Sequence, residues 1–103
     1  MPSGLEIEEV VEGTGAVAEP GCAVTIRWRG KPRRGDEFGA GTQSFRLGDR
    51  SVIAGLGLGV QGMRVGGKRR LRISPHLGYG DRAVPGVPPN AVLLIEVELL
   101  SVD

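Results

Sequence analysis

The chain is poor in the residues on which many catalytic and metal sites are built. It has one cysteine, Cys22, and one histidine, His76, so it predicts no internal disulfide and no metal site of clustered ligands. We expect His76 to lie exposed in a loop and Cys22 to be a small buried side chain. No arrangement of serine or cysteine with histidine stands out, which disfavours covalent hydrolysis. The sequence therefore predicts no cofactor.

Long apolar runs are also missing. None approaches the roughly 18 residues of a membrane-spanning helix, and the opening "MPSGLEIEEV" lacks the basic and apolar regions of a signal peptide. With the lone cysteine, these features favour a cytoplasmic protein that makes no membrane contact. No repeat or linker divides residues 1–103, so we expect a single domain and a monomer.

Charge is balanced in total, with a net value of +1, but not along the chain. Residues 1–26 contain glutamates and no lysine or arginine, whereas all 13 basic residues lie within 27–82. The simplest interpretation of the basic cluster, which includes Lys68, Arg69, Arg70 and Arg72, is a solvated outer face of a sheet. It is also a candidate docking surface, but nucleic acid is the weaker alternative, because the cluster lacks aromatic side chains that stack on bases.

Aromatic residues are scarce, whereas glycine makes up 18 of 103 residues, more than twice the average of roughly 7%. The scattered glycines indicate turns and bulges of a β-rich fold. Period-two patterns predict strands, with loops between them that include "GAGTQS" (39–44). The predicted strands are 5–11, 22–29, 44–47, 68–74 and 91–102.

One short helix is predicted between the third and fourth strands. Ile53, Leu56, Val60 and Met63 form an apolar stripe of helical period, although the glycines among them disfavour a helix unless packing supports it. These elements predict an α+β domain in which an antiparallel sheet packs on one helix. "GLGVQG" (57–62) and "GMRVGGKR" (62–69) come close to nucleotide-binding motifs, but neither has the strand–loop–helix frame that such motifs need.

Several ordered segments together resemble a known family. "VIAGLGLGVQGMRVGGKRRLRIS", "YG" and "VPPNAVLLIEVELL" are similar to the FKBP-type peptidyl-prolyl cis-trans isomerases, the macrolide-binding immunophilins, and the resemblance runs from Leu5 to Val102. It implies a five- to six-stranded antiparallel half-barrel sheet wrapped around one short helix, with an apolar pocket between them. It also implies an isomerase that acts on X–Pro bonds of peptides or proteins and assists folding.

The resemblance also implies which residues form that pocket. Tyr79 matches the loop tyrosine whose hydroxyl bonds a substrate carbonyl, and Phe38 and Trp28 match aromatic positions of the catalytic site. The backbone N–H of Ile53 matches an amide that bonds ligands. The other residues that match substrate-binding positions are Val52, Ile53, Leu56, Val87, Ile95 and Gln43.

Several positions depart from the family pattern, and among them Gln43 stands near another position that is usually aromatic. Gly39 stands where an acidic residue usually follows the phenylalanine, and Trp28 stands where a tyrosine is usual. Leu56 and Ile95 replace aromatic residues. These departures predict reduced isomerase activity and weak macrolide binding, and they keep open an alternative function as a non-catalytic protein-binding or chaperone module.

Overall fold

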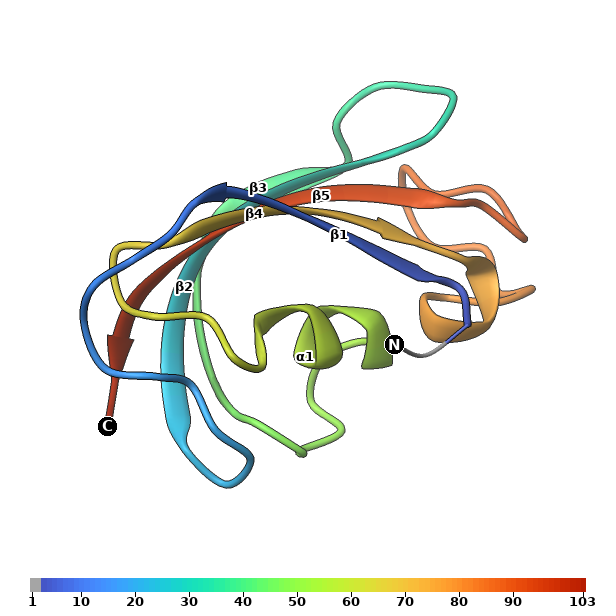
Figure 1. The fold of residues 1–103 in the computed structure, drawn as a ribbon. Coiled ribbons are helices and arrows are strands. Elements are labelled where there is room, and N and C mark those ends of the chain that lie inside the picture. Colours follow the sequence, from blue (N-terminus) through green and yellow to red (C-terminus); the bar gives the residue numbers. More distant parts are fainter. Residues whose placement is uncertain (1–2) are drawn as a thin grey trace.

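The computed structural model describes residues 3–103 as a curved antiparallel sheet that arches over one short helix (Figure 1). The strand order across the sheet is β1-β4-β5-β2-β3. The elements in chain order are β1 (Leu5–Val11), β2 (Ala23–Pro32), β3 (Gly39–Arg46), α1 (Ala54–Val60), β4 (Lys68–Ile73), the 3-10 turn η1 (Pro75–Leu77) and β5 (Leu93–Val102). The predicted α+β class with one helix is confirmed.

The concave face of the sheet carries the core. Alternate residues of β5, from Leu93 to Leu99, are all buried, as their period-two pattern predicts. Leu71 and Ile73 of β4 lie opposite Ile95 and Leu93, so the two central strands present one continuous apolar surface. The apolar stripe of the helix packs on this surface, and Leu56, Val60 and Met63 are buried with it.

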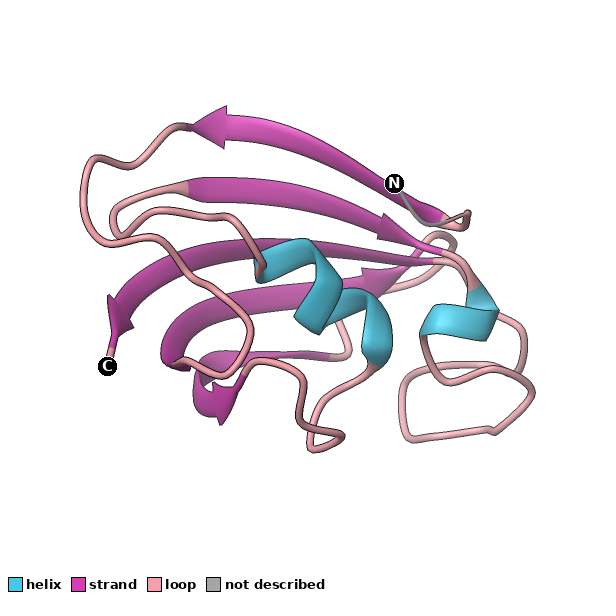
Figure 2. Ribbon diagram, turned by 60° about the horizontal axis from the view of Figure 1, so that its bottom comes forward, coloured by secondary structure: helices cyan, strands magenta, loops and turns pink. Residues whose placement is uncertain are grey.

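Two helix glycines allow α1 to lie directly on the sheet (Figure 2). A Cβ atom at Gly59 would lie 2.4 Å from Cδ1 of Leu71, and one at Gly55 would lie 2.5 Å from Cγ2 of Ile73. Gly57 differs, because a Cβ there would meet nothing within 4 Å. At these two positions glycine lowers the intrinsic helix propensity, but it allows the helix backbone to pack closely against the sheet.

The prediction that residues 39–44 form a loop is wrong. They belong to β3, which pairs with β2 in regular antiparallel register from Gly39 opposite Gly30 to Arg46 opposite Ala23. Glycine and small polar residues have little strand propensity, so the segment shows no pattern of its own. Its strand conformation comes from pairing with β2, which itself extends past the predicted limit to Pro32.

The prediction that Arg69 lies on the solvated outer face of the sheet is wrong. Its side chain faces the helix and is only 14% exposed. Its Nη1 donates hydrogen bonds to the carbonyl oxygens of Gly59 (3.0 Å) and Gln61 (2.9 Å), and its Nε pairs with Glu9 of β1. Carbonyls at the end of a helix have no partner within the helix. Arg69 thus joins β1, β4 and the end of α1.

Arg69→Ala is expected to lower the free energy of unfolding by about 2 kcal/mol, because hydrogen bonds to a charged group contribute about 1.5–3 kcal/mol. The neighbouring Arg70→Ala is the matched control. Its ion pairs lie on the surface, with the Arg70 side chain 58% exposed, and should contribute less than about 1 kcal/mol. Urea unfolding measures both. Equal losses in the two variants would contradict the role given to Arg69.

Candidate functional site

A cavity of about 420 Å³ opens between the start of α1 and the concave face of the sheet. Eight of the nine residues predicted to form a site line it. They are Trp28, Phe38, Gln43, Val52, Ile53, Leu56, Tyr79 and Ile95. Residues from β2, β3, α1, β5 and three loops therefore converge on a single site.

Three aromatic rings follow one another along the cavity wall. The centroids of Trp28 and Phe38 are 6.1 Å apart with the planes tilted by 41°. The rings of Phe38 and Tyr79 meet edge to face, at 6.4 Å and 82°. Edge-to-face contacts of this kind are favourable arrangements of aromatic quadrupoles. Three of the four aromatic residues of the chain are thus concentrated at one cavity.

Phe38 is held between two glycines. A Cβ atom at Gly30 would lie 2.9 Å from its Cζ, and one at Gly86 would lie 2.9 Å from its Cβ. The backbone N–H of Phe38 also donates to the carbonyl of Gly30 at 2.9 Å. The proline-containing loop therefore packs directly on Phe38 at Gly86 and fixes the position of the ring.

The glycines around Tyr79 have backbone roles. Gly80 has a positive φ of 61°, which costs glycine little, and its carbonyl accepts a hydrogen bond from the N–H of Asn90 at 2.7 Å. A Cβ at Gly78 would lie 3.1 Å from Leu93. The Tyr79 hydroxyl has no hydrogen-bond partner among residues 3–103. The loop thus holds a phenol at the cavity with its polar end free for a ligand.

Ile53 brings a backbone donor to the same cavity. It is the N-cap residue of α1, with φ −60° and ψ 146°, and its carbonyl accepts the first bonds of the helix from Leu56 and Gly57. Within the described part of the chain no acceptor pairs with the Ile53 N–H. Two free donors, this amide and the Tyr79 hydroxyl, therefore belong to residues that line one cavity.

Val87 is the predicted site residue that the structure does not bring to the cavity. It is 4% exposed and packs in the core. Its N–H donates to Val84 at 2.9 Å across a turn whose central residues are Pro85 and Gly86, with φ of Gly86 at 81°. Proline followed by a glycine of positive φ is typical of a type II turn. Val87 anchors the loop that supports Phe38 rather than lining the cavity.

Two arginines at the cavity were missed from the sequence. Arg50 and Arg82 are both exposed and both line it, together with Ser51. The sequence signal for them is their proximity to predicted site residues, since Arg50 shortly precedes Val52 and Arg82 shortly follows Tyr79. No aspartate or glutamate is among the lining residues.

The absence of an acidic side chain at Gly39 is linked to the position of the Trp28 indole. A Cβ atom at Gly39 would lie 2.9 Å from Cη2 of the indole. This approach is closer than real Cβ contacts, so any side chain at residue 39 requires the indole to move. Two departures from the family pattern, Trp28 and Gly39, are therefore coupled through one contact.

His76 is exposed, as predicted, and lies in η1 with its Nε2 3.0 Å from the carbonyl oxygen of Ser3. Cys22 is half-buried rather than buried, and it packs at the edge of the core. Across residues 3–103 no three histidines, cysteines or carboxylates gather as a metal site. No helix in this range is long and apolar enough to cross a membrane.

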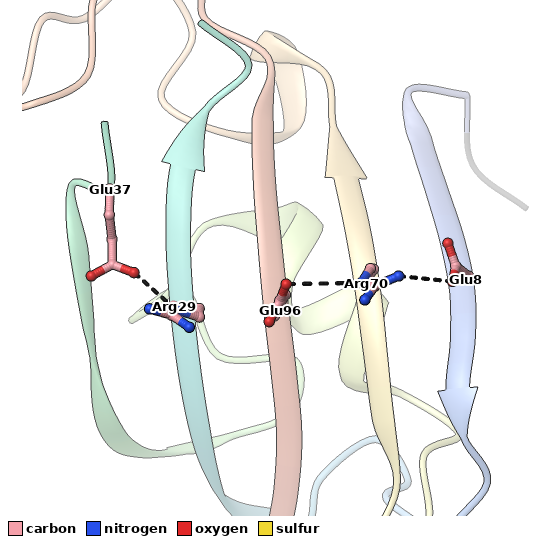
Figure 3. Close-up of polar contacts among 5 residues, drawn as sticks. All are labelled: Glu8, Arg29, Glu37, Arg70 and Glu96. Atoms are coloured by element: carbon pink, nitrogen blue, oxygen red, sulfur yellow. Dashed lines mark hydrogen bonds and ion pairs between the residues drawn. The ribbon is translucent and has the colours of Figure 1, made fainter. Parts of the chain in front are cut away.

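The convex face of the sheet carries alternating charges rather than a basic patch (Figure 3). Arg70 on β4 lies 3.3 Å from Glu8 of β1 and 3.8 Å from Glu96 of β5. Arg29 on β2 donates to Glu37 at 2.9 Å, and this hydrogen bond, more than the charge of Glu37, raises the pKa of Arg29. The acidic neighbours disfavour binding of nucleic-acid phosphates at this face.

Two hollows of about 610 and 570 Å³ lie on the convex face. Ion-paired residues, among them Arg70 and Glu96, form part of both walls. The concave cavity instead gathers three aromatic rings on one wall, and Tyr79 and Ile53 bring it two free hydrogen-bond donors. It is therefore the better candidate site.

Comparisons with known proteins agree with this choice. The family described as FKBP-type peptidyl-prolyl cis-trans isomerase matches residues 15–100. The chain is 45% identical, over 96% of its length, to FK506-binding protein 4 of Neurospora crassa. It is 44% identical, over 98% of its length, to FK506-binding protein 4 of Dictyostelium discoideum. It covers 22% and 29% of these two relatives, so it spans less than a third of their length.

Solved structures match the fold as well as the sequence. The crystal structure of AtFKBP13 superposes with a TM-score of 0.88 at 34% identity, and the match covers 97% of this chain and 94% of that one. The structure of FkpA from Escherichia coli gives a TM-score of 0.87 at 37% identity, covering 98% of this chain and 49% of that one. The half-barrel around one helix is thus the fold of these proteins.

Proposed function

Because the chain belongs to the family of FKBP-type peptidyl-prolyl cis-trans isomerases, we propose that it catalyses cis–trans isomerisation of X–Pro peptide bonds in the concave cavity and so assists protein folding. The observation that carries this proposal is the pairing of an aromatic-lined cavity with two free hydrogen-bond donors, the Tyr79 hydroxyl and the Ile53 N–H. No nucleophile is required, since the reaction breaks no covalent bond.

The chemistry needs only selective stabilisation of a twisted amide. Rotation about a peptide bond faces a barrier of ~18–20 kcal/mol, because resonance holds the bond planar. In the twisted state the resonance is lost and the amide is less polar, so an apolar cavity favours it over the planar state. Each ~1.4 kcal/mol of such preference gives a tenfold faster reaction.

Each cavity residue then has a defined part. Phe38 and Trp28 offer ring faces to the proline, while Val52, Ile53, Leu56 and Ile95 keep its surroundings dry. The Tyr79 hydroxyl and the Ile53 N–H donate to substrate carbonyls and hold the peptide on either side of the rotating bond. Gln43 at β3 contributes a polar edge to the cavity.

Tyr79→Phe is expected to lower kcat/KM for short proline peptides by about three- to tenfold, the equivalent of one hydrogen bond of about 1 kcal/mol. A protease-coupled assay or NMR exchange measures the rate. Val102→Ala, at the far end of β5, is the control and should leave the rate unchanged. Failure of the wild type at micromolar concentration to accelerate any proline peptide would refute the proposed activity.

A second candidate function is a binding module that grips proline-containing segments or unfolded chains with little catalysis. The observation that favours it is the altered wall, in which Leu56 and Ile95 are aliphatic and Gly39 supplies no acid. Such a module would suppress aggregation of an unfolded client in both wild type and Tyr79→Phe, whereas the isomerase activity would be absent from both.

The names of the relatives suggest a ligand for the same cavity. We propose that the chain binds FK506 or a related macrolide weakly, because Leu56 and Ile95 provide less ring surface than aromatic residues would.

We also propose a cytoplasmic, monomeric domain. The single half-buried Cys22 supports a reducing compartment. Stacking two convex faces would desolvate their exposed ion pairs, which is unfavourable and supports a monomer.

A further inference from the structure

The rim of the cavity carries positive charge without a compensating carboxylate. Arg50 enters from the segment before α1 and Arg82 from the loop after Tyr79. No lining residue is acidic. A ligand in the cavity therefore lies beside two guanidinium groups, with no acidic residue in the cavity lining.

These arginines differ from those of the convex face. Arg27, Arg29 and Arg70 each pair with a glutamate within 4 Å, whereas neither Arg50 nor Arg82 has such a partner in the described residues. The neighbouring Asp49 turns to the backbone, where its Oδ1 accepts from the N–H of Ser51 at 2.9 Å. The charges of Arg50 and Arg82 thus stay available to a ligand.

Gly39 supplies no acid at the position that is acidic in the family pattern. A Cβ atom there would lie 2.9 Å from Cη2 of Trp28, so an acidic side chain would also require the indole to move. The site therefore combines an aromatic-lined cavity with two rim arginines and no lining acid.

We propose that this cavity selects X–Pro segments that carry a carboxylate side chain, Glu or Asp, directly beside the proline, with Arg50 and Arg82 as the specificity-determining residues. The inference rests on the proposed function, since it places proline in the apolar cavity. Guanidinium groups bind carboxylates through paired hydrogen bonds, and the exposure of both arginines allows them to reach a side chain at the rim.

The test uses four short peptides with Glu or Gln placed immediately before or immediately after one proline. Binding is followed by the fluorescence of Trp28, the single tryptophan of the chain, and catalysis by the rate relative to the uncatalysed rate of the same peptide. In at least one position, the Glu peptide should bind about three- to tenfold more tightly than its Gln partner and show a similar gain in kcat/KM, as expected for two exposed ion pairs. The preference should shrink towards one at about 1 M salt, where the Debye length is roughly 3 Å.

Matched variants assign the preference to the rim. Arg50→Gln with Arg82→Gln should bring the Glu-to-Gln binding ratio to about one, whereas Arg72→Gln on the convex face should leave it unchanged. Equal binding of Glu and Gln peptides by the wild type, or a ratio unaffected by the double variant, would overturn the inference. Tighter binding of Glu peptides without any isomerisation would uphold the inference and refute only the proposed catalysis.

Discussion

Gly59→Ala is expected to lower the free energy of unfolding by about 3 kcal/mol, at the upper end of the usual cost of overpacking. The added methyl group would lie 2.4 Å from Cδ1 and 2.7 Å from Cδ2 of Leu71. Leu71 is 2% exposed, so either its side chain leaves its packed position or α1 moves away from β4. This loss exceeds the gain of about 1 kcal/mol that alanine provides over glycine in a helix.

Gly57→Ala is the matched control, two residues away in the same helix. It meets no atom within 4 Å, so only the propensity gain remains and the variant should be more stable than the wild type by up to about 1 kcal/mol. Urea unfolding of both variants gives the two values. Changes of the same sign and size would show that the packing at Gly59 has been misjudged.

A double-mutant cycle with Leu71→Ala identifies the contact. Leu71→Ala alone should cost about 2–5 kcal/mol, because it leaves a cavity in the core. Combined with Gly59→Ala, the total loss should be clearly smaller than the sum of the two single losses, since each change relieves the other. Strict additivity would place the strain at Gly59 elsewhere than at Leu71.

The sequence predicts the helix, but it does not predict which of the helix glycines contact the sheet. The apolar stripe from Ile53 to Met63 located α1 correctly, because helical period is a local property. Helix propensity alone makes all the glycines of this segment equally unfavourable for a helix. Only the tertiary approach of β4 distinguishes Gly55 and Gly59, which meet the sheet, from Gly57, which faces open space.

The third strand illustrates the same limit. The strands at 5–11 and 68–73 were predicted to within a residue from their alternating side chains. Leu71 and Ile73 of β4 are both buried, whereas Leu5 is the buried residue of β1. Residues 39–43 alternate no apolar side chains, and their strand conformation depends on hydrogen bonds to β2. Sequence patterns reveal buried side chains more readily than hydrogen bonding between strands. An edge strand of small residues buries few side chains, so its pattern is weak.

The proposed site rests chiefly on the family resemblance. Residues such as Trp28 and Ile95 lie on strands whose periodicity shows only that they face inward, not that they border a cavity. Arg50 and Arg82 were missed because single charged residues in loops carry no periodic signal. Val87 was misplaced because an apolar residue in a proline loop can either line a cavity or anchor the loop, and only the turn from Val84 to Val87 decides between them.

Gly39→Asp should lower kcat/KM for proline peptides by about tenfold or more, although it restores the acid of the family pattern. The new Cβ would lie 2.9 Å from Cη2 of Trp28, so the indole must leave its place beside Phe38, and the first ring of the aromatic wall is displaced. The atom that faces residue 39 is a ring carbon, not the indole N–H, so the carboxylate also gains no donor there.

Trp28→Tyr should reverse this effect when it is combined with Gly39→Asp. A tyrosine lacks the outer part of the indole that blocks residue 39, and its hydroxyl can donate to the new carboxylate. We expect the double variant to recover kcat/KM to within about threefold of the wild type, a coupling energy of at least about 0.7 kcal/mol between the two positions. The four proteins of the cycle are compared in the NMR exchange assay, with urea unfolding to separate activity from stability. Additive losses would show that Trp28 and Gly39 act independently, whereas recovery only in the double variant would show that the indole excludes the acid.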